Sequence, residues 1–265
     1  MHTFQKYWHI FWHLRKLELM RMMEYRGDFI FFSFLSTLWT IFNFFFFSLI
    51  FNVSDTIAGW SADEMYLLLG TFTILDAFTW TFFYHNMSSY TRHVFTGSLS
   101  MLLTKPISTI FLLTTAKNSY NNIFRFFIGC FTVYHYTKKL GVQPSVWDIT
   151  LYCLLIFASL LLIYAVWFIT ATFAFWIEKL DNINEIIPGL RRVMQVPKGV
   201  FVGASSLLFT VVLPFGLVSS VPSEVLLQRA DVPSIIWLLL SSVIAVVGAI
   251  KFFTFAIKKY SSVGN

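Results

Sequence analysis

Long uninterrupted runs of apolar residues alternate with short polar segments along this chain, and the pattern predicts six membrane-spanning helices. A helix needs about 20 apolar residues to cross the roughly 30 Å hydrocarbon core of a bilayer. The runs that reach this length are residues 29–51, 65–85, 118–136, 149–177, 200–220 and 235–257. Because their hydrophobicity is continuous rather than alternating, they exclude the strands of a transmembrane barrel.

The fifth run contains the signals of a broken helix. Pro214, Gly216 and Pro222 lie at or just beyond its end. Helix-breaking residues at membrane depth are tolerated only where protein or water shields the freed backbone groups. We therefore expect the fifth span to break near its outer end and to leave a short re-entrant piece there.

Residues 1–28 form a segment of their own, for which the pattern predicts an amphipathic helix at the membrane interface. Phe4, Trp8 and Phe11 recur at helical spacing. Another face carries basic side chains, namely His2, Lys6, His9, His13 and Lys16. Two interpretations stay open: a simple surface anchor, or an elbow that braces the first span against neighbouring helices or a partner. The histidines alone do not indicate a metal site, because no cysteine or carboxylate cluster accompanies them.

The composition supports a membrane protein and excludes a soluble one. Of the 265 residues, 57% are hydrophobic and only 12% are charged, with a mean hydropathy of +0.70. Soluble domains carry roughly twice that charge. We therefore expect an all-α polytopic membrane protein, with residues 1–265 forming one transmembrane domain. Cys130 and Cys153 lie inside predicted spans, so no disulfide framework is implied.

The basic residues predict the orientation of the chain in the membrane. Most of the 19 Lys and Arg residues fall in the N-terminal segment, the second-to-third and fourth-to-fifth connections, and the C-terminal tail. The opposite connections carry only Lys138, Lys139 and Arg229. Cytoplasmic loops are enriched in Lys and Arg, so both termini are expected in the cytoplasm. The net charge of +6 then faces anionic lipid, and no nucleic-acid partner is needed to explain it.

Three polar residues inside the second and third predicted spans are candidates for function. Asp76 lies near the middle of the second span, and Asn122 and Arg125 share one face of the third. Charged residues in a bilayer are costly and are functional candidates by default. We expect an Asp76–Arg125 ion pair. Its role is open between a structural pair, a polar lining of a substrate path or subunit interface, and proton coupling through Asp76.

No enzyme site is visible in the sequence. The G-x-x-x-x-G-K-[ST] pattern of a phosphate-binding loop is absent, and no nucleophile, base and orienting group occur together. We therefore expect no cofactor in this chain. Its energy would come from an ion gradient or from another subunit.

A short polar interruption, "GSLSMLLTKPIS" at residues 97–108, predicts a cytoplasmic helix with one apolar side. Ser98 can cap it, and Lys105 and Pro106 follow its carbonyl end. Its apolar stripe consists of Leu99, Leu102 and Leu103.

This stretch with the preceding threonine, "TGSLSMLLTKPIS", resembles the "G-T-L-E-x-L-L-x-x-P-I-S" signature of ABC-2-type permeases, the membrane subunits of one class of ABC exporters. Six spans, cytoplasmic ends and an amphipathic N-terminus are similar to that family. "WSADEMYLLLGTFTI" is similar to a bacterial subfamily that occurs with a second permease and an ATPase subunit. Ser98 replaces the usual threonine and Ser100 the usual acid, so the charged contact to the ATPase is open between Arg92 and Lys105.

The resemblance implies a permease of the bacterial cell membrane that pairs with a second permease, as a homo- or heterodimer, around a substrate path. Separate P-loop ATPase subunits would bind ATP and Mg²⁺ and push on two cytoplasmic loops, residues 89–106 and 178–199. The second loop places Ile183, Ile186, Ile187 and Leu190 at helical spacing around Pro188, which predicts a bent amphipathic helix. The expected coupling residues are Arg92, Gly97, Ser98, Leu99, Leu102, Leu103, Lys105, Pro106, Arg191 and Arg192.

Other classes remain open. Either loop could be an ordinary solvated connection. The chain could be a secondary transporter or channel that needs no ATPase, although neither an intramembrane chain of acids nor an inverted repeat is found. A membrane-embedded enzyme or a scaffold subunit is a third possibility.

Overall fold

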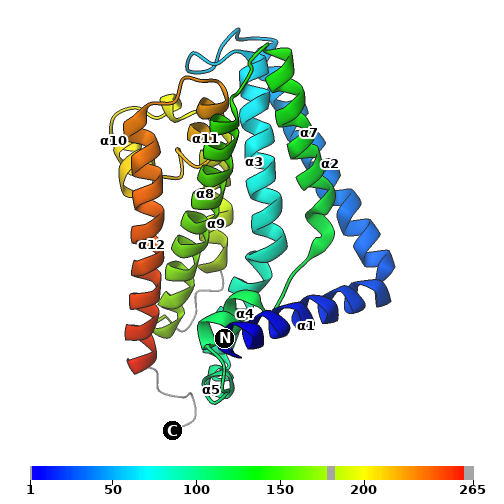
Figure 1. Ribbon diagram of the computed structural model, residues 1–265, viewed down its shortest axis with the longest axis vertical. Coiled ribbons are helices and arrows are strands. Elements are labelled where there is room, and N and C mark those ends of the chain that lie inside the picture. The colour runs from blue at the N-terminus through cyan, green and yellow to red at the C-terminus, as the bar shows by residue number, and fades with distance from the viewer. Residues whose placement is uncertain (1, 178–182, 260–265) are drawn as a thin grey trace.

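Helices build all of the regular structure in the part of the chain that the computed structural model describes, residues 2–177 and 183–259 (Figure 1). Four helices are long and apolar enough to cross a membrane. They are α2 (Arg26–Phe51), α3 (Ala62–Phe82) continued by α4 (Tyr84–Phe95), α8 (Val146–Thr172) and α12 (Val232–Lys259). The shorter helices are α1 (His2–Glu24), α5 (Leu99–Leu103), α6 (Thr109–Thr115), α7 (Ile123–Lys139), α9 (Ile186–Gly189), α10 (Ala204–Ser206) and α11 (Ser220–Leu226).

The bundle has two distinct ends. The loop of residues 52–61 lies at the upper end in Figure 1, together with α10 and α11. The short helix α5, the start of α1 and the C-terminal end of α12 lie at the lower end. Helix α1 runs across this lower end instead of along the bundle, and α2 rises from it to the upper end.

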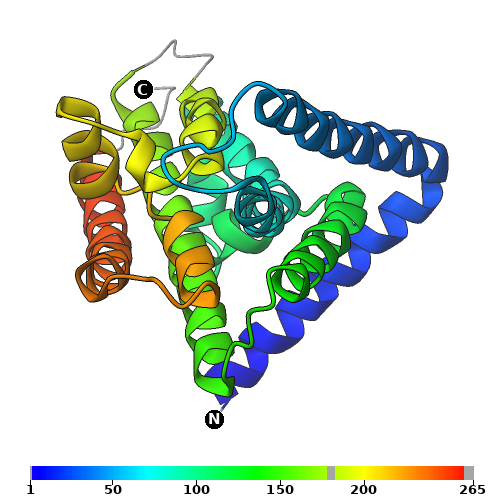
Figure 2. The same ribbon diagram turned by 90° about the horizontal axis from the view of Figure 1, so that it is seen from above.

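Helix α3 is the central element, with α2, α7 and α8 around it (Figure 2). Its residues from Leu67 to Ala77 are all buried, as expected for a helix that is apolar on every side. A capping box between Ser61 and Glu64 starts it at the upper end. The hydroxyls of its buried threonines donate to carbonyls one turn back, so burial leaves them with a partner.

Two glycines bring α3 and α7 into close contact. A Cβ built on Gly129 of α7 would lie 2.9 Å from both the carbonyl oxygen of Gly70 and the amide nitrogen of Ile74 on α3. A Cβ on Gly70 would lie 3.0 Å from Val133. Small residues at such a crossing let helix backbones approach closely in membranes. The two helices therefore form one tightly packed pair.

Helix α2 contacts the bundle along a narrow stripe. Its buried residues, Ser33, Thr40 and Phe47, follow a seven-residue spacing. Most of its other large side chains, including many of its phenylalanines, are exposed. The exposed apolar surface is available to lipid or to another subunit.

The predicted third span, residues 118–136, begins in the structure with a single 3₁₀ turn, Tyr120–Asn122. It continues as α7, whose 17 residues extend three residues past the predicted end. Asn118 and Ser119 precede the turn, and the Ser119 amide donates to the Thr81 carbonyl of α3. The beginning of the predicted span is thus tied to the lower end of α3 instead of continuing the helix.

The predicted fifth span, residues 200–220, is not a continuous helix. Residues 204–212 form α10 and a π-helical turn, Leu207–Val212, and residues 213–219 form turns before α11. The break falls at Pro214 and Gly216. The Gly216 amide donates to the Phe209 carbonyl, and a Cβ on Gly216 would lie 3.0 Å from that oxygen.

After α8 the chain returns to the upper end through residues 185–199, whereas the sequence predicted that it returns through residues 200–220. Glu185 accepts a bond from Tyr84 at the lower end of α3, Arg191 pairs with Asp76 in its middle, and Gly199 lies beside Ala58 of the upper loop. The sequence analysis predicted that residues 178–199 form a loop at one end of the bundle. For the described residues 183–199 this prediction is wrong, because they run along α3 from the lower end to the upper end. This stretch contains two 3₁₀ segments, Leu190–Gln195 and Lys198–Val200. Because a 3₁₀-helix rises further per residue than an α-helix, a short segment can run from one end of α3 to the other. Residues 178–182 lie outside the described residues.

We predict that Gly129→Ala destabilises the protein, because the added methyl group overlaps the backbone of α3. Overpacking of this kind costs about 1–3 kcal/mol. Gly248→Ala in α12 is the matched control, since no atom lies within 4 Å of the position that its Cβ would take and alanine favours helix by up to about 1 kcal/mol. The thermal unfolding midpoint in detergent should fall for the first variant only. Equal midpoints would contradict the close packing of α3 and α7.

Candidate functional site

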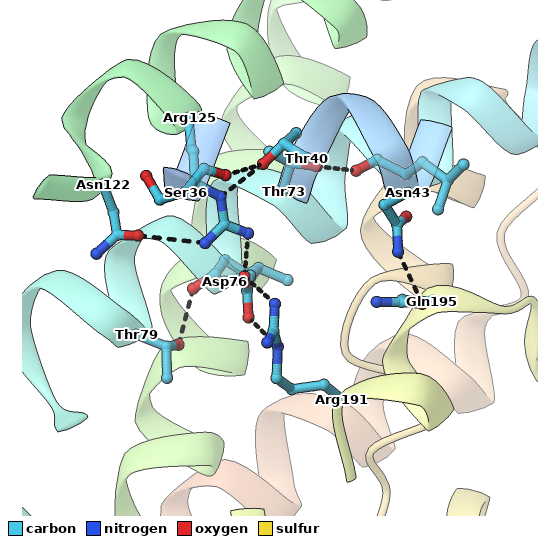
Figure 3. A network of polar contacts seen from close by, with 12 residues as sticks. Ser36, Thr40, Asn43, Thr73, Asp76, Thr79, Asn122, Arg125, Arg191 and Gln195 are labelled. Atoms are coloured by element: carbon cyan, nitrogen blue, oxygen red, sulfur yellow. Dashed lines mark hydrogen bonds and ion pairs between the residues drawn. The ribbon is translucent and has the colours of Figure 1, made fainter. Parts of the chain in front are cut away.

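The most unusual feature of the interior is one carboxylate held between two arginines. Nη2 of Arg125 donates to Oδ2 of Asp76 (Figure 3). From the other side, Nη2 of Arg191 donates to Oδ2 at 2.6 Å, and its Nε lies 2.6 Å from Oδ1. The Asp76 side chain is only 3% exposed, and Arg125 is buried as well.

Three separate elements bring these charges together. Asp76 belongs to the central helix α3, and its side chain points toward α7. Arg125 lies on α7 one helical turn before Gly129, where the two helices are in close contact. Arg191 comes from the 3₁₀ segment Leu190–Gln195, which follows Pro188 and Gly189. Sequence analysis predicted the Asp76–Arg125 ion pair, and the structure contains it. It placed Arg191 among the coupling residues of a surface loop, whereas the structure directs this side chain into the network.

Polar neighbours bind the other two nitrogens of the Arg125 guanidinium. Its Nε donates to the Thr40 hydroxyl of α2 at 2.6 Å, and its Nη1 donates to Oδ1 of Asn122 at 3.2 Å. Arg191 lies over the Trp80 ring, with 5.5 Å between the guanidinium carbon and the ring centroid. Thr40 and Trp80 were missed from the sequence. The seven-residue spacing of Ser33, Thr40 and Phe47 could have pointed to Thr40.

The network carries more positive than negative charge. One carboxylate faces two guanidiniums, and no other acid contacts them among the described residues. A buried ion pair gains little over apolar packing, but removing one partner is costly because the other charge is left unpaired. The arrangement therefore joins α3, α7 and the segment around Arg191 and makes their positions depend on Asp76.

A second polar seam runs above the network between α3, α8 and α11. The hydroxyls of Thr71 and Tyr152 lie 3.2 Å apart, and Ser223 of α11 donates to Thr71 at 3.0 Å. Ser159 of α8 donates to the Val218 carbonyl at 2.8 Å, just before α11. Small hydroxylated residues thus hold the broken segment inside the bundle.

An ion cluster closes the upper end. Nζ of Lys198 lies 2.8 Å from Glu224 of α11, also pairs with Asp231, and donates to Ser234 of α12 at 3.0 Å. Burial raises the pKa of Asp231, but the bonds from Lys198 and Ser234 outweigh it and lower the pKa to about 2. Asp231 therefore stays ionised at neutral pH. Lys198, predicted in a cytoplasmic loop, lies at the end opposite α5.

The predicted coupling residues on α5 divide into buried and exposed ones. Leu99 is fully buried and Leu102 packs on the core, whereas Leu103, with Met101, is exposed. Lys105, Pro106 and Arg92 are exposed as well. The chain turns into α5 at Gly97, whose φ of +70° favours glycine.

The predicted helix cap at Ser98 is wrong. Its backbone is already helical and its side chain caps no amide of α5. Its hydroxyl instead lies 2.8 Å from Nδ1 of His93 and 2.8 Å from the Thr96 hydroxyl. Ser98 therefore ties α5 to the end of α4.

Helix α1 contacts the turn after α5. Nζ of Lys6 donates to the Pro106 carbonyl at 2.9 Å, and the Ser108 amide donates to the Tyr7 hydroxyl at 3.0 Å. The Tyr7 ring packs edge-on against Phe111 of α6. Of the two interpretations of the N-terminal segment, these contacts favour the brace.

Metal chemistry has no evident site. Among the described residues, no group of three or more His, Cys, Asp or Glu side chains could hold a metal ion.

We predict that Asp76→Asn lowers stability far more than Arg191→Gln. The first change leaves the buried Arg125 and the partly buried Arg191 without a carboxylate and should cost about 3–5 kcal/mol, whereas the second leaves the neutral Asp76–Arg125 pair intact. Arg192→Gln, at an exposed neighbour, is the control. Thermal midpoints of the purified variants test this order. A midpoint for Asp76→Asn at or above that of Arg191→Gln would show that the network does not hold these elements together.

Comparison with known proteins identifies the family of the chain. No curated protein matches the chain. The sequence profile of a family described as ABC-2 family transporter protein matches residues 37–264, which cover α3, α7, α8 and α12 completely together with most of α2. The chain therefore belongs to the ABC-2 family of transporter proteins.

Proposed function

We propose that this chain is the permease subunit of an ATP-driven exporter in a bacterial cell membrane. It would form the substrate path with a second permease and depend on separate P-loop ATPase subunits. Membership of the ABC-2 family supports a membrane permease. The positions of individual charges and exposed apolar residues support the remaining points.

The exposed side chain of Arg192 is the observation that carries the proposal of a path. Its neighbour Arg191 contacts Asp76 near the middle of α3, so Arg192 lies at a similar depth but points away from the bundle. No ion-pair partner for it is found within residues 2–177 and 183–259. A cation at this depth avoids lipid and faces protein or a water-filled cavity. A second permease on this face would enclose an aqueous path lined by Arg192.

The proposed topology has six crossings with both termini in the cytoplasm. Four are the long helices, the third is α7, and the fifth is the segment between Glu185 and Lys198. The lower end is then cytoplasmic, since the basic α1, Arg92, Lys105 and the basic end of α12 gather there. Moving Lys198 to the upper end reduces this charge bias without reversing it. Helix α1, with Phe4, Trp8 and Trp12 exposed, would lie in the interface as an elbow helix.

Force from the ATPase would enter through α5. Met101 and Leu103 form a small exposed apolar surface at the lower end, flanked by Lys105, while Leu99 and Leu102 anchor the helix to the core. The bonds from α1 to Pro106 and Ser108 would keep the turn after α5 from yielding. In this proposal the chain is not an enzyme and holds no cofactor, and ATP with Mg²⁺ is bound by the partner subunits.

We predict that Arg192→Cys reacts with a membrane-impermeant thiol reagent in native membranes. The background is Cys130→Ser with Cys153→Ser, and the control is Phe42→Cys, an exposed residue half a turn from Thr40 at a similar depth. Because thiolates form only where water reaches, the first variant should react about tenfold faster. Equal rates would contradict an aqueous path at Arg192.

We also predict that Met101→Asp combined with Leu103→Asp abolishes coupling. A P-loop ATPase should copurify with the wild-type chain from its native membranes but not with this variant, because charges replace the apolar docking surface. Val53→Asp, at an exposed apolar residue of the upper loop, should have no effect. Unchanged copurification and ATP hydrolysis would exclude α5 as the docking helix. Transport by the purified chain without any ATPase would instead favour the alternative, a secondary transporter or channel.

A further inference from the structure

A pocket of about 630 Å³ lies at the lower end, at the corner between α1 and α2. Its walls come from the last turn of α1, the first turns of α2, the junction of α3 with α4, and residues 118–122. It is distinct from the ATPase-docking surface on α5 and has no role in the function proposed so far. We propose that it binds an amphiphile whose head group carries an ammonium, a zwitterionic phosphatidylethanolamine-like lipid taken from the cytoplasmic leaflet.

The walls divide into a polar and an apolar part. Amides and hydroxyls from Ser36, Asn118, Ser119, Asn121 and Asn122 make up the polar part, and aromatic rings dominate the rest. Asn118 is 2% exposed, and its Oδ1 has no hydrogen-bond partner among the described residues. Buried acceptors are rarely left unpaired. This wall therefore favours a ligand that donates hydrogen bonds.

The charges at the pocket favour an ammonium over an anion. Arg21 is already paired with Glu18 at 2.8 Å, whereas Asp28 is exposed and has no ion-pair partner among the described residues. An ammonium would find the Asp28 carboxylate and the aromatic rings of Tyr25 and Tyr84. The guanidinium of Arg21 has five N–H donors, of which Glu18 uses few, so a phosphate can still bind there. An anionic head group would instead meet Asp28 without compensation.

The position of the pocket suits a lipid with its tail in the bilayer. Helix α1 lies across the lower end with exposed aromatic residues, which are typical of the head-group level. Phe29 and Phe32 line the pocket on α2, whose next turn continues with the exposed Phe34 and Leu35. A head group in the pocket would thus leave its acyl chains along this apolar surface.

The pocket also adjoins the buried ion network. Asn122, one of its walls, accepts a bond from Arg125, and Trp80, another wall, carries Arg191 on its ring. A bound head group would contact both. We infer that the pocket is where the permease takes up its cargo, a part of the inference that rests on the proposed function.

Binding is tested by native mass spectrometry of the purified chain with dioleoyl phosphatidylethanolamine or dioleoyl phosphatidylglycerol. Wild type should retain the zwitterionic lipid about tenfold better than the anionic one, because only the zwitterionic head group has an ammonium to compensate the Asp28 carboxylate. Ser119→Phe and Asn121→Phe, which fill the pocket, should lose this binding. Thr137→Phe is the matched control, because it fills a cavity of about 650 Å³ between α7 and α8 near the other end.

Asp28→Asn should remove the preference for phosphatidylethanolamine, and Asp28→Glu should keep it. Asp28 is exposed, so these variants test the proposal even if the pocket-filling ones unfold. Equal binding of the two lipids to wild type, or an unchanged preference in Asp28→Asn, would overturn the site.

The cargo role has its own readout. Phosphatidylethanolamine should stimulate ATP hydrolysis by the copurified wild-type complex but not by the Ser119→Phe complex. Binding without stimulation would overturn the cargo role and leave a structural lipid site. Pocket-dependent binding by a chain that never associates with an ATPase would overturn the proposed function and leave the binding site standing.

Discussion

The interior of this permease is organised around the carboxylate of Asp76. Without it, two guanidiniums would lie unpaired in and beside the helix bundle, at a cost of about 3–5 kcal/mol, which is a large part of the stability of a typical domain. Its two partners come from different kinds of element, one from the regular helix α7 and one from the irregular segment around Arg191. The same carboxylate therefore fixes a helix–helix packing and the course of a chain segment built of short α-helical and 3₁₀ turns. The positions of Trp80, Asn122 and Thr40 follow from it.

The irregular segment between Glu185 and Lys198 lies beside buried polar side chains. A segment of several short helical turns has many helix ends, and each end leaves backbone groups without an intrahelical partner. In the bilayer these groups must be shielded by protein. Ser219, just before α11, donates to the Met194 carbonyl of this segment, and the Lys198 amide donates to the Ser220 hydroxyl of α11. Buried hydroxyl groups thus supply hydrogen-bond partners for backbone groups of the irregular segment.

Sequence reasoning predicted the helical membrane class, the four long helices, the α5 turn and the Asp76–Arg125 pair, because each depends on local hydrophobicity, turn residues or the cost of an isolated charge. It failed at residues 183–220. There, apolar runs such as "VFVGASSLLFTVVL" read as a span, yet they lie at the upper end with Val202 and Leu207 exposed. The residues that run along α3 are the mixed stretch from Glu185 to Lys198, whose contacts with Tyr84 and Asp76 reveal its course. Hydropathy measures affinity for lipid, whereas this segment is surrounded largely by protein. The helix cap assigned to Ser98 failed for a different reason, since a nearby histidine competes for its hydroxyl.

The distribution of contacts has a mechanical consequence. Packing between helices is concentrated in two pairs, α3 with α7 and α8 with α12, whereas α3 touches α8 much less. The first pair is fixed by glycine contacts and the Asp76–Arg125 bond, and the second by an apolar core that also takes in Phe72 and Leu75 of α3. Each pair should behave as a stiff lever arm. Between the pairs lie this shared apolar core, α11 and the segment from Glu185 to Lys198, so a displacement at the lower end is expected to appear as relative rotation of the two pairs rather than as bending of any one helix.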